Sequence, residues 1–319
     1  MSRAEPAADR DIMRLVAELY YQRELNQPEI AELTGYSVSK VSRLLTAARE
    51  QGVVRITVEP PEAARTTAAQ ELAERFGLTI ELAPGGAGDD AAASRLAGLA
   101  AADRLAARLP HEGVVGIAAG YTVAALVTAL PALSRPGLTI VPVVGGWDIQ
   151  NQLFDGNELA RRMAERLGAR ARSLHAPAVL DSPATKDALL RDSAIGSLAA
   201  QWDALDLAVL GIGGAPYAHP GYRTAIDRLD EESRAELATL DVVGDIACHF
   251  LGRAGGFLDS WSARTLAIPI VALRRVPLVF AAAAGASKAP AILGALRTRL
   301  LHVLVTDAPT AEAVAKLAG

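Results

Sequence analysis

Beyond about residue 60 the chain alternates β-rich runs with helical patterns, and no other feature limits its fold as strongly. The β-rich runs lie at residues 78–82, 114–118, 138–144, 172–177, 206–211, 276–283 and 302–305. Strands that alternate with helices pair in parallel, and the helices cover both faces of the sheet. We therefore expect a mainly parallel α/β domain, whose ligands would bind at the carboxyl ends of the strands.

One uncharged stretch, residues 113–134, is long enough to cross a bilayer. Its glycines, Thr122 and Pro131 divide it into a β-rich run, a glycine turn and an apolar helix. We interpret it as a buried strand–loop–helix unit of the α/β domain, and we expect no membrane association.

The composition suits a two-domain protein of a reducing compartment. The chain has 319 residues, 51% of them hydrophobic, which is enough for one small and one large domain. A single cysteine, Cys248, excludes an internal disulfide framework, and the charged N-terminus has no apolar signal-peptide core. We therefore expect a cytoplasmic protein. The formal net charge of −4 argues against uniform coating of nucleic acid but allows a local basic surface.

Residues 10–50 predict three short helices with a tight turn between the second and the third. Pro28 suits the first turn of the second helix, Gly35 can take the positive φ that ends it, and Ser37 stands where an N-cap belongs. Two helices joined by a short glycine turn form a helix-turn-helix. The apolar positions at helical spacing are Ile12, Leu15, Val16, Leu19, Tyr20, Ile30, Ala31, Leu33, Val38, Val41, Leu44, Leu45 and Ala48.

The third helix has the side chains of a helix that reads DNA. Hydroxyl and cationic groups can donate to base edges and phosphates in the major groove. Residues 1–34 contain four Lys or Arg against seven Asp or Glu, whereas residues 35–55 contain four against one, so the positive charge lies on this helix. The DNA-binding candidates are Ser37, Ser39, Lys40, Ser42 and Arg43.

An alternating run at residues 52–58 predicts a strand that packs as a wing and places Arg55 near the DNA backbone. A three-helix bundle with a solvated charged face is the alternative. The turn glycine, the cap, the hydroxyl-rich face and the charge distribution together favour a winged helix-turn-helix.

These residues resemble a known family. The stretch ELNQPEIAELTGYSVSKVSRLLTAAREQGVVRITV is similar to the DNA-binding domain of the SorC-type sugar-responsive transcriptional regulators of bacteria. The resemblance continues in the family's order through GVVGIAAGYTVAAL, IVPVVGG, LHAPAVL, LAVLGIGG, GDIACHFL, AGASKAPAILGAL and LVTDAPTAEAV. Each segment is weak by itself, but seven in order are strongly specific and cover nearly the whole chain.

The resemblance implies a DNA-binding domain at residues 1–59 and a Rossmann-like effector and oligomerisation domain at residues 60–319, similar in fold to the sugar-phosphate isomerases and deaminases. A Pro-Pro break near residue 60 suits that boundary. Such regulators are usually tetrameric, and they release or rearrange on operator DNA when a sugar, commonly phosphorylated, binds. We accordingly expect double-stranded operator DNA, a sugar or sugar-phosphate effector, and a dimer or tetramer of the chain.

The loop GIAAGYT, residues 116–122, leaves a predicted strand and opens a predicted helix. Gly120 allows close backbone approach, and the exposed N–H groups and the Thr122 hydroxyl can face an anion. A tight turn without a ligand is the alternative from the residues alone. Because Gly120 and Thr122 match the family, the resemblance implies an effector-binding loop, with Tyr121 between them.

Two charged residues are further effector candidates. Lys288, one of only four lysines, follows a predicted strand and a glycine loop at a helix start, where an ammonium could pair with a phosphate or remain solvated. Asp245 is a lone carboxylate among apolar residues, so it either forms a structural salt bridge or accepts hydrogen bonds from ligand hydroxyls. The resemblance places both residues at the sugar.

Asn151 and Gln152 also match polar effector contacts of the family, although a polar loop before a helix accounts for them nearly as well. The chain departs from the family at Ala118 and Ala119, where a glycine and a bulky or polar residue are usual. Val144 stands where some relatives have a basic residue. The change at Ala118 and Ala119 affects the geometry of a phosphate site, whereas Val144 indicates fewer contacts to an anion, and so one phosphate and not two.

A sugar-phosphate isomerase or deaminase with an appended helical domain is the alternative function. Such an enzyme needs a positioned general base, and Asp245 is the only carboxylate that the sequence places in the candidate pocket. His249 beside Cys248 suggests a metal or thiol site, but no further ligand or base stands at a recognisable spacing. We therefore expect no catalytic residues, no metal and no cofactor.

Overall fold

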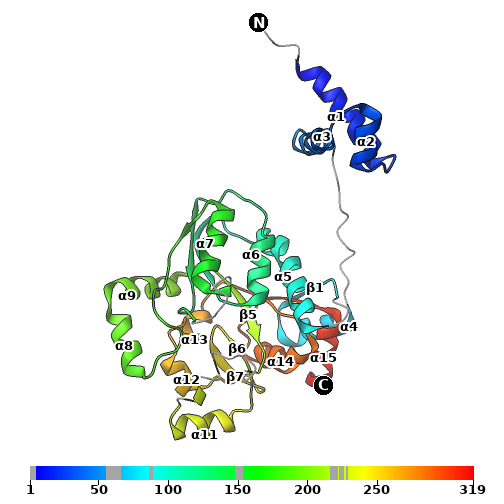
Figure 1. Ribbon diagram of the computed structural model, residues 1–319. Coiled ribbons are helices and arrows are strands. Elements are labelled where there is room, and N and C mark those ends of the chain that lie inside the picture. Colours follow the sequence, from blue (N-terminus) through cyan, green and yellow to red (C-terminus); the bar gives the residue numbers. More distant parts are fainter. Residues whose placement is uncertain are drawn as a thin grey trace. The chain divides into compact units, whose positions relative to one another are not determined.

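The computed structural model describes residues 5–54, 66–85, 89–147, 154–215, 222, 226–227 and 229–319. The chain divides into two compact units, residues 1–62 and 63–319 (Figure 1). No helix in the described part of the chain is long and apolar enough to cross a membrane.

The N-terminal unit consists of three helices around a small core. They are α1 (Glu5–Tyr21), α2 (Gln27–Thr34) and α3 (Val38–Glu50). A reciprocal pair of hydrogen bonds between Asn26 and Glu29 caps the start of α2, and Gly35, with φ 71°, ends it. The core contains Met13, Val16, Ala17, Ile30, Ala31, Val41, Leu45 and Ala48.

Three apolar residues that were expected to face this core are exposed instead. Leu15 is 51% exposed, Leu33 68% and Val38 45%. Leu15 and Leu33 point away from the buried faces of their helices, since successive residues turn by about 100°. Val38 is the first residue of α3 and lies beyond the packed part of the helix.

The larger unit contains a mainly parallel sheet, which confirms the predicted fold class. Its strands are β1 (Thr79–Ala83), β2 (Glu112–Ile117), β3 (Gly137–Pro142), β4 (Arg170–Ala171), β5 (Leu207–Gly213), β6 (Val242–Ile246), β7 (His249–Gly252), β8 (Leu278–Ala282) and β9 (Val303–Asp307). The order β1-β9-β8-β5-β2-β3-β4 is parallel throughout. The β6–β7 hairpin is antiparallel and joins the end of β5.

Helices cover both faces of this sheet because its strands alternate between two cores. On β5, Leu207 and Val209 belong to one core, and Ala208 and Leu210 belong to the other. The helices are α4 (Thr67–Phe76), α5 (Asp90–Ala106), α6 (Tyr121–Ala129), α7 (Gly156–Leu167), α8 (Pro183–Arg191), α9 (Ser193–Ala199), α11 (Glu231–Thr239), α12 (Asp259–Arg264), α13 (Ile270–Leu273), α14 (Ala289–Arg297) and α15 (Ala308–Ala318). The first core contains residues of α5, α6 and α7, and the second contains residues of α4, α14 and α15.

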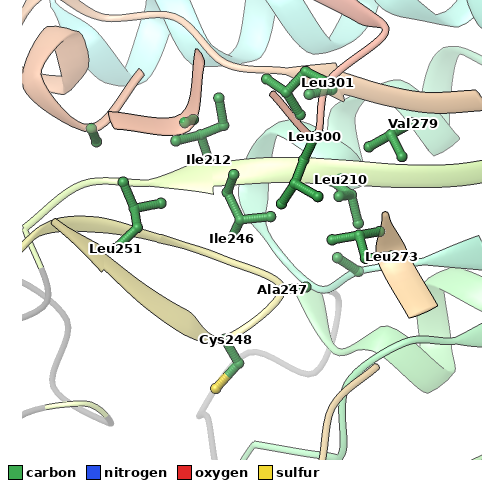
Figure 2. Packing of buried hydrophobic residues seen from close by; sticks show 14 of the residues in the cluster. Leu210, Ile212, Ile246, Ala247, Cys248, Leu251, Leu273, Val279, Leu300 and Leu301 are labelled. Atoms are coloured by element: carbon green, nitrogen blue, oxygen red, sulfur yellow. The ribbon is translucent and has the colours of Figure 1, made fainter. Parts of the chain in front are cut away.

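One predicted strand is wrong, and one hairpin was not predicted. The run at 172–177 is not a strand, and β4 ends at Ala171. The Asn157 side chain donates to the Leu174 carbonyl and accepts from the Leu174 N–H, so neither group is left to pair with a neighbouring strand. The β6–β7 hairpin is the addition. Figure 2 shows its residues Ile246 and Leu251 turned toward buried side chains of β5, with Cys248 at the turn.

Candidate functional site

The outer face of α3 is built as a polar surface opposite the core. Val41, Leu45 and Ala48 are buried, whereas the candidates Ser39, Lys40, Ser42 and Arg43 are all exposed. This division follows the helical period, so one side of α3 stays free of packing. The arrangement suits a helix that enters the major groove.

The start of α3 is fixed by its own side chains. Ser37 accepts a hydrogen bond from the backbone N–H of Lys40, which makes it the predicted N-cap. The Lys40 ammonium lies 3.8 Å from the ring centroid of Tyr36. Arg43 has no such contact among the described residues. The chain forms a turn and a bend at residues 51–54, while Arg55 and the rest of the predicted wing lie outside the described residues.

The larger unit has its switch of strand order between β2 and β5. After β2 the next strands, β3 and β4, lie on one side of it, whereas β5, β8 and β9 lie on the other side. The carboxyl ends of two such strands border the crevice where open α/β sheets bind ligands. All the described effector candidates lie at this edge: Gly120 precedes α6, Tyr121 and Thr122 open α6, Asp245 lies on β6, and Lys288 ends a 3₁₀ turn after β8.

The loop after β2 opens α6 without a side-chain cap. Gly120 has φ 136° and open space at the position of a Cβ, and its N–H donates to the Phe154 carbonyl. Thr122 is buried, whereas Tyr121 is 63% exposed and packs on Phe154 with ring centroids 3.9 Å apart. Among the described residues, no side-chain cap satisfies the first N–H groups of α6, which leaves a partial positive charge at this strand end.

The carboxyl end of β5 lies beside Asp245 of β6, which pairs with Gly213. A Cβ on Gly213 would lie 1.9 Å from the carboxylate oxygen Oδ1, so only glycine fits there. The other oxygen, Oδ2, accepts from the Tyr222 hydroxyl at 2.8 Å and from the Cys248 N–H at 3.3 Å. Burial raises the pKa of Asp245 to about 6, although these hydrogen bonds and the charge of Lys288 oppose the rise.

Lys288 lies at the end of the loop after β8. Its ammonium donates to the Ser94 hydroxyl at 3.1 Å, and its side chain lies beside Gly214 at the end of β5. Burial lowers the pKa of Lys288, whereas the charges of Asp245 and Asp90 oppose that change. The ammonium therefore stands among polar groups and two carboxylates, with donor capacity beyond its bond to Ser94.

The structure thus brings Asp245 and Lys288 together and places Gly120, Tyr121 and Thr122 at the neighbouring strand end. Asn151 and Gln152 lie outside the described residues. Sequence reasoning missed Tyr222, because a tyrosine in a polar stretch carries no signal of the carboxylate that it will meet in space.

His249 and Cys248 have structural roles. Because a carbonyl only accepts, His249 Nε2 donates to Ile268, and Nδ1 accepts from the Ser262 hydroxyl. Burial lowers the pKa of His249 to about 4 and raises the pKa of the Cys248 thiol. No group of three potential metal ligands occurs within the described ranges.

A helix-turn-helix unit followed by an α/β unit with polar side chains at its switch of strand order is the domain arrangement typical of a ligand-responsive transcriptional regulator. The family model Sugar-bind, a sugar-binding domain, matches residues 62–316. The chain is 31% identical to the sorbitol operon regulator of Klebsiella pneumoniae over 319 residues, covering 98% of this chain and 100% of that one. The erythritol catabolism regulatory protein EryD of Brucella abortus is 26% identical over 311 residues, covering 96% and 97%.

Solved structures agree. The full-length sorbitol operon regulator SorC of Klebsiella pneumoniae matches with a TM-score of 0.70 and 29% identity, covering 97% of this chain and 100% of that one. The chain belongs to the SorC-type family of sugar-binding transcriptional regulators. The predicted family and the predicted sugar-responsive regulation are confirmed, and so is the prediction that the chain is not an enzyme, since its close relatives are regulators.

Proposed function

We propose that α3 binds operator DNA and that a sugar bound at the β2/β5 crevice changes the operator affinity. The observation that carries the effector site is the meeting of Asp245, Tyr222 and Lys288 beside the uncapped start of α6. Residues 1–59 would be the DNA-binding domain, and residues 60–319 would bind the effector and form the oligomer. Regulation requires two states of the protein, one with high and one with low affinity for DNA, and the sugar must bind one of them more tightly than the other.

The crevice suits a sugar that carries one phosphate. Carboxylate oxygens accept from hydroxyl groups, so Asp245 would bind the sugar's hydroxyls. The start of α6 would take the phosphate, because free helix N–H groups and the helix dipole favour an anion there. Lys288 already faces Asp90 and Asp245, so its charge is partly balanced and supports one phosphate better than two.

The chain would act in the cytoplasm as a dimer or tetramer. Two copies of α3 must reach half-sites about 34 Å apart, or a multiple of that spacing, on an operator with two-fold symmetry. The names of the two relatives suggest a sugar or its phosphate from the metabolism of a sugar alcohol.

The effector class is tested by thermal unfolding of the full-length protein with sugar alcohols, ketoses and their monophosphates. A ligand at a hundred times its Kd should stabilise the protein by about 2.7 kcal/mol. We expect the largest increase in Tm with a monophosphate, and a smaller one in the Lys288→Ala variant. An increase in Tm with unphosphorylated sugars alone would contradict the proposed phosphate. It would not affect the assignment of the chain as a sugar-responsive regulator.

Effector binding should also depend on pH. The pKa of Asp245 is raised to about 6, so the folded protein without ligand loses this negative charge as the pH falls through 6. A protonated carboxylic acid accepts hydroxyl hydrogen bonds less well, and we expect sugar affinity to fall by up to about tenfold per pH unit below 6. Titrations at a series of pH values would show this, and a dependence as steep in Asp245→Asn as in the wild type would contradict it.

The raised pKa of Asp245 also makes the free energy of unfolding depend on pH, and this dependence runs in the opposite direction to that of sugar affinity. The folded state holds the Asp245 proton more tightly than the unfolded chain does, since the folded pKa lies above the ordinary value. The contribution of Asp245 to the free energy of unfolding therefore declines as the pH rises from about 4 to about 6.

A further inference from the structure

The three tryptophans of the chain have different environments. Trp202 is 3% exposed and donates its indole N–H to the Pro142 carbonyl, and Trp261 is fully buried and donates to the Cys248 carbonyl. Trp147, in contrast, is only partly buried. It packs against the larger core, and part of its side chain remains exposed.

Trp147 follows β3, which is the neighbour of β2 at the switch of strand order. Its ring meets the Tyr222 ring edge to face, with centroids 4.8 Å apart and an angle of 88°. Tyr222 in turn packs on Phe250 at 4.9 Å, and Phe250 stacks on Trp261 at 4.1 Å. A continuous row of rings thus runs from the buried core to the partly exposed indole, so the indole rests on a packed support.

The same tyrosine connects this row to the candidate carboxylate. The Tyr222 hydroxyl donates to Asp245 Oδ2, while Oδ1 accepts no hydrogen bond from the described residues. Oδ1 lies against the Gly213 backbone, where a Cβ would be 1.9 Å from it, so glycine at position 213 allows the carboxylate to take this position. Tyr222 therefore holds an apolar ring surface and a carboxylate with an available oxygen next to each other.

This combination matches the chemistry of a sugar. A sugar has hydroxyl groups around its edge and C–H groups on its faces, so it needs hydrogen-bond acceptors beside an apolar surface. Ligand pockets commonly join aromatic side chains to a few placed polar groups in this way.

We propose that Trp147 is a specificity-determining residue of the effector site, where its indole contacts the C–H face of the sugar whose hydroxyls bind Asp245. Tyr222 is then a positioning residue, because it fixes both partners. This assignment rests on the proposed sugar effector. It adds an apolar contact surface, the Trp147 indole, that a sugar would use and inorganic phosphate would not.

Tryptophan fluorescence of the full-length protein tests the assignment. The other two tryptophans are buried, so iodide should quench mainly Trp147, and most of the quenchable emission should be absent in Trp147→Phe. A sugar or sugar monophosphate that raises Tm should protect this emission, whereas inorganic phosphate should not. Equal quenching of the wild type and Trp147→Phe would overturn the assignment.

Affinity measurements with the same sugar separate a binding role from a structural one. Trp147→Ala should weaken binding by about tenfold, and Trp147→Phe should recover most of the loss, because phenylalanine restores an aromatic face for the C–H groups of the sugar. The matched control Trp202→Phe should lower Tm without changing affinity. Unchanged affinity in Trp147→Ala, with Tm still raised by the sugar, would contradict this assignment alone. No Tm response to any sugar would contradict the proposed effector as well.

Discussion

Replacing Arg43 with alanine is expected to lower operator affinity by roughly 30-fold or more. Arg43 is exposed on the outer face of α3, where a guanidinium can bond to a guanine edge or to phosphate. Such a contact contributes about 1–3 kcal/mol, and two half-sites would lose it together. The measurement is fluorescence anisotropy with a duplex that the protein has selected from a random pool, at fixed salt concentration.

Sugar binding should be unchanged in this variant, because residue 43 belongs to the smaller unit. Arg14→Ala is the matched control, since it removes the same charge from α1, where the exposed pair with Glu18 contributes little. Operator affinity equal in Arg43→Ala and Arg14→Ala would show that α3 is not the helix that reads DNA.

Replacing Asp245 with asparagine is expected to lower effector affinity by roughly 10- to 100-fold. A hydrogen bond to a charged group contributes about 1.5–3 kcal/mol, and the available Oδ1 is the proposed acceptor for a sugar hydroxyl. The substitution also removes the negative charge that faces Lys288. Isothermal titration with the sugar that raises Tm most would measure the loss.

Operator binding without sugar should remain in Asp245→Asn, but sugar should no longer change it at concentrations that affect the wild type. Asp203→Asn is the control, because Asp203 forms an exposed pair with Arg275 on the surface. If Asp245→Asn binds the sugar with wild-type affinity, this carboxylate is not part of the effector site.

The features that sequence predicts well are those fixed locally. Ser37 and Gly35 take the cap and turn geometry that their chemistry favours, because a hydroxyl cap and a positive φ depend on adjacent residues alone. Most strands of the parallel sheet follow in the same way from apolar runs between helical patterns.

The features that sequence misses depend on contacts between distant segments. The β6–β7 turn places Ala247 and Cys248 at φ 47° and 65°, where Asn-Gly is the usual signal of a hairpin. The Asp245 carboxylate accepts from the Cys248 N–H in this turn. Tyr222 meets Asp245 across 23 residues, a pairing that spacing does not reveal.

The most direct test of the account measures operator affinity of the full-length protein with and without the sugar that raises Tm most. Coupling between two sites is typically 5- to 150-fold and is reciprocal. We predict that saturating sugar changes operator affinity by a factor in this range, and that operator DNA changes sugar affinity by the same factor. A sugar that binds at the crevice and leaves operator affinity unchanged would contradict the account.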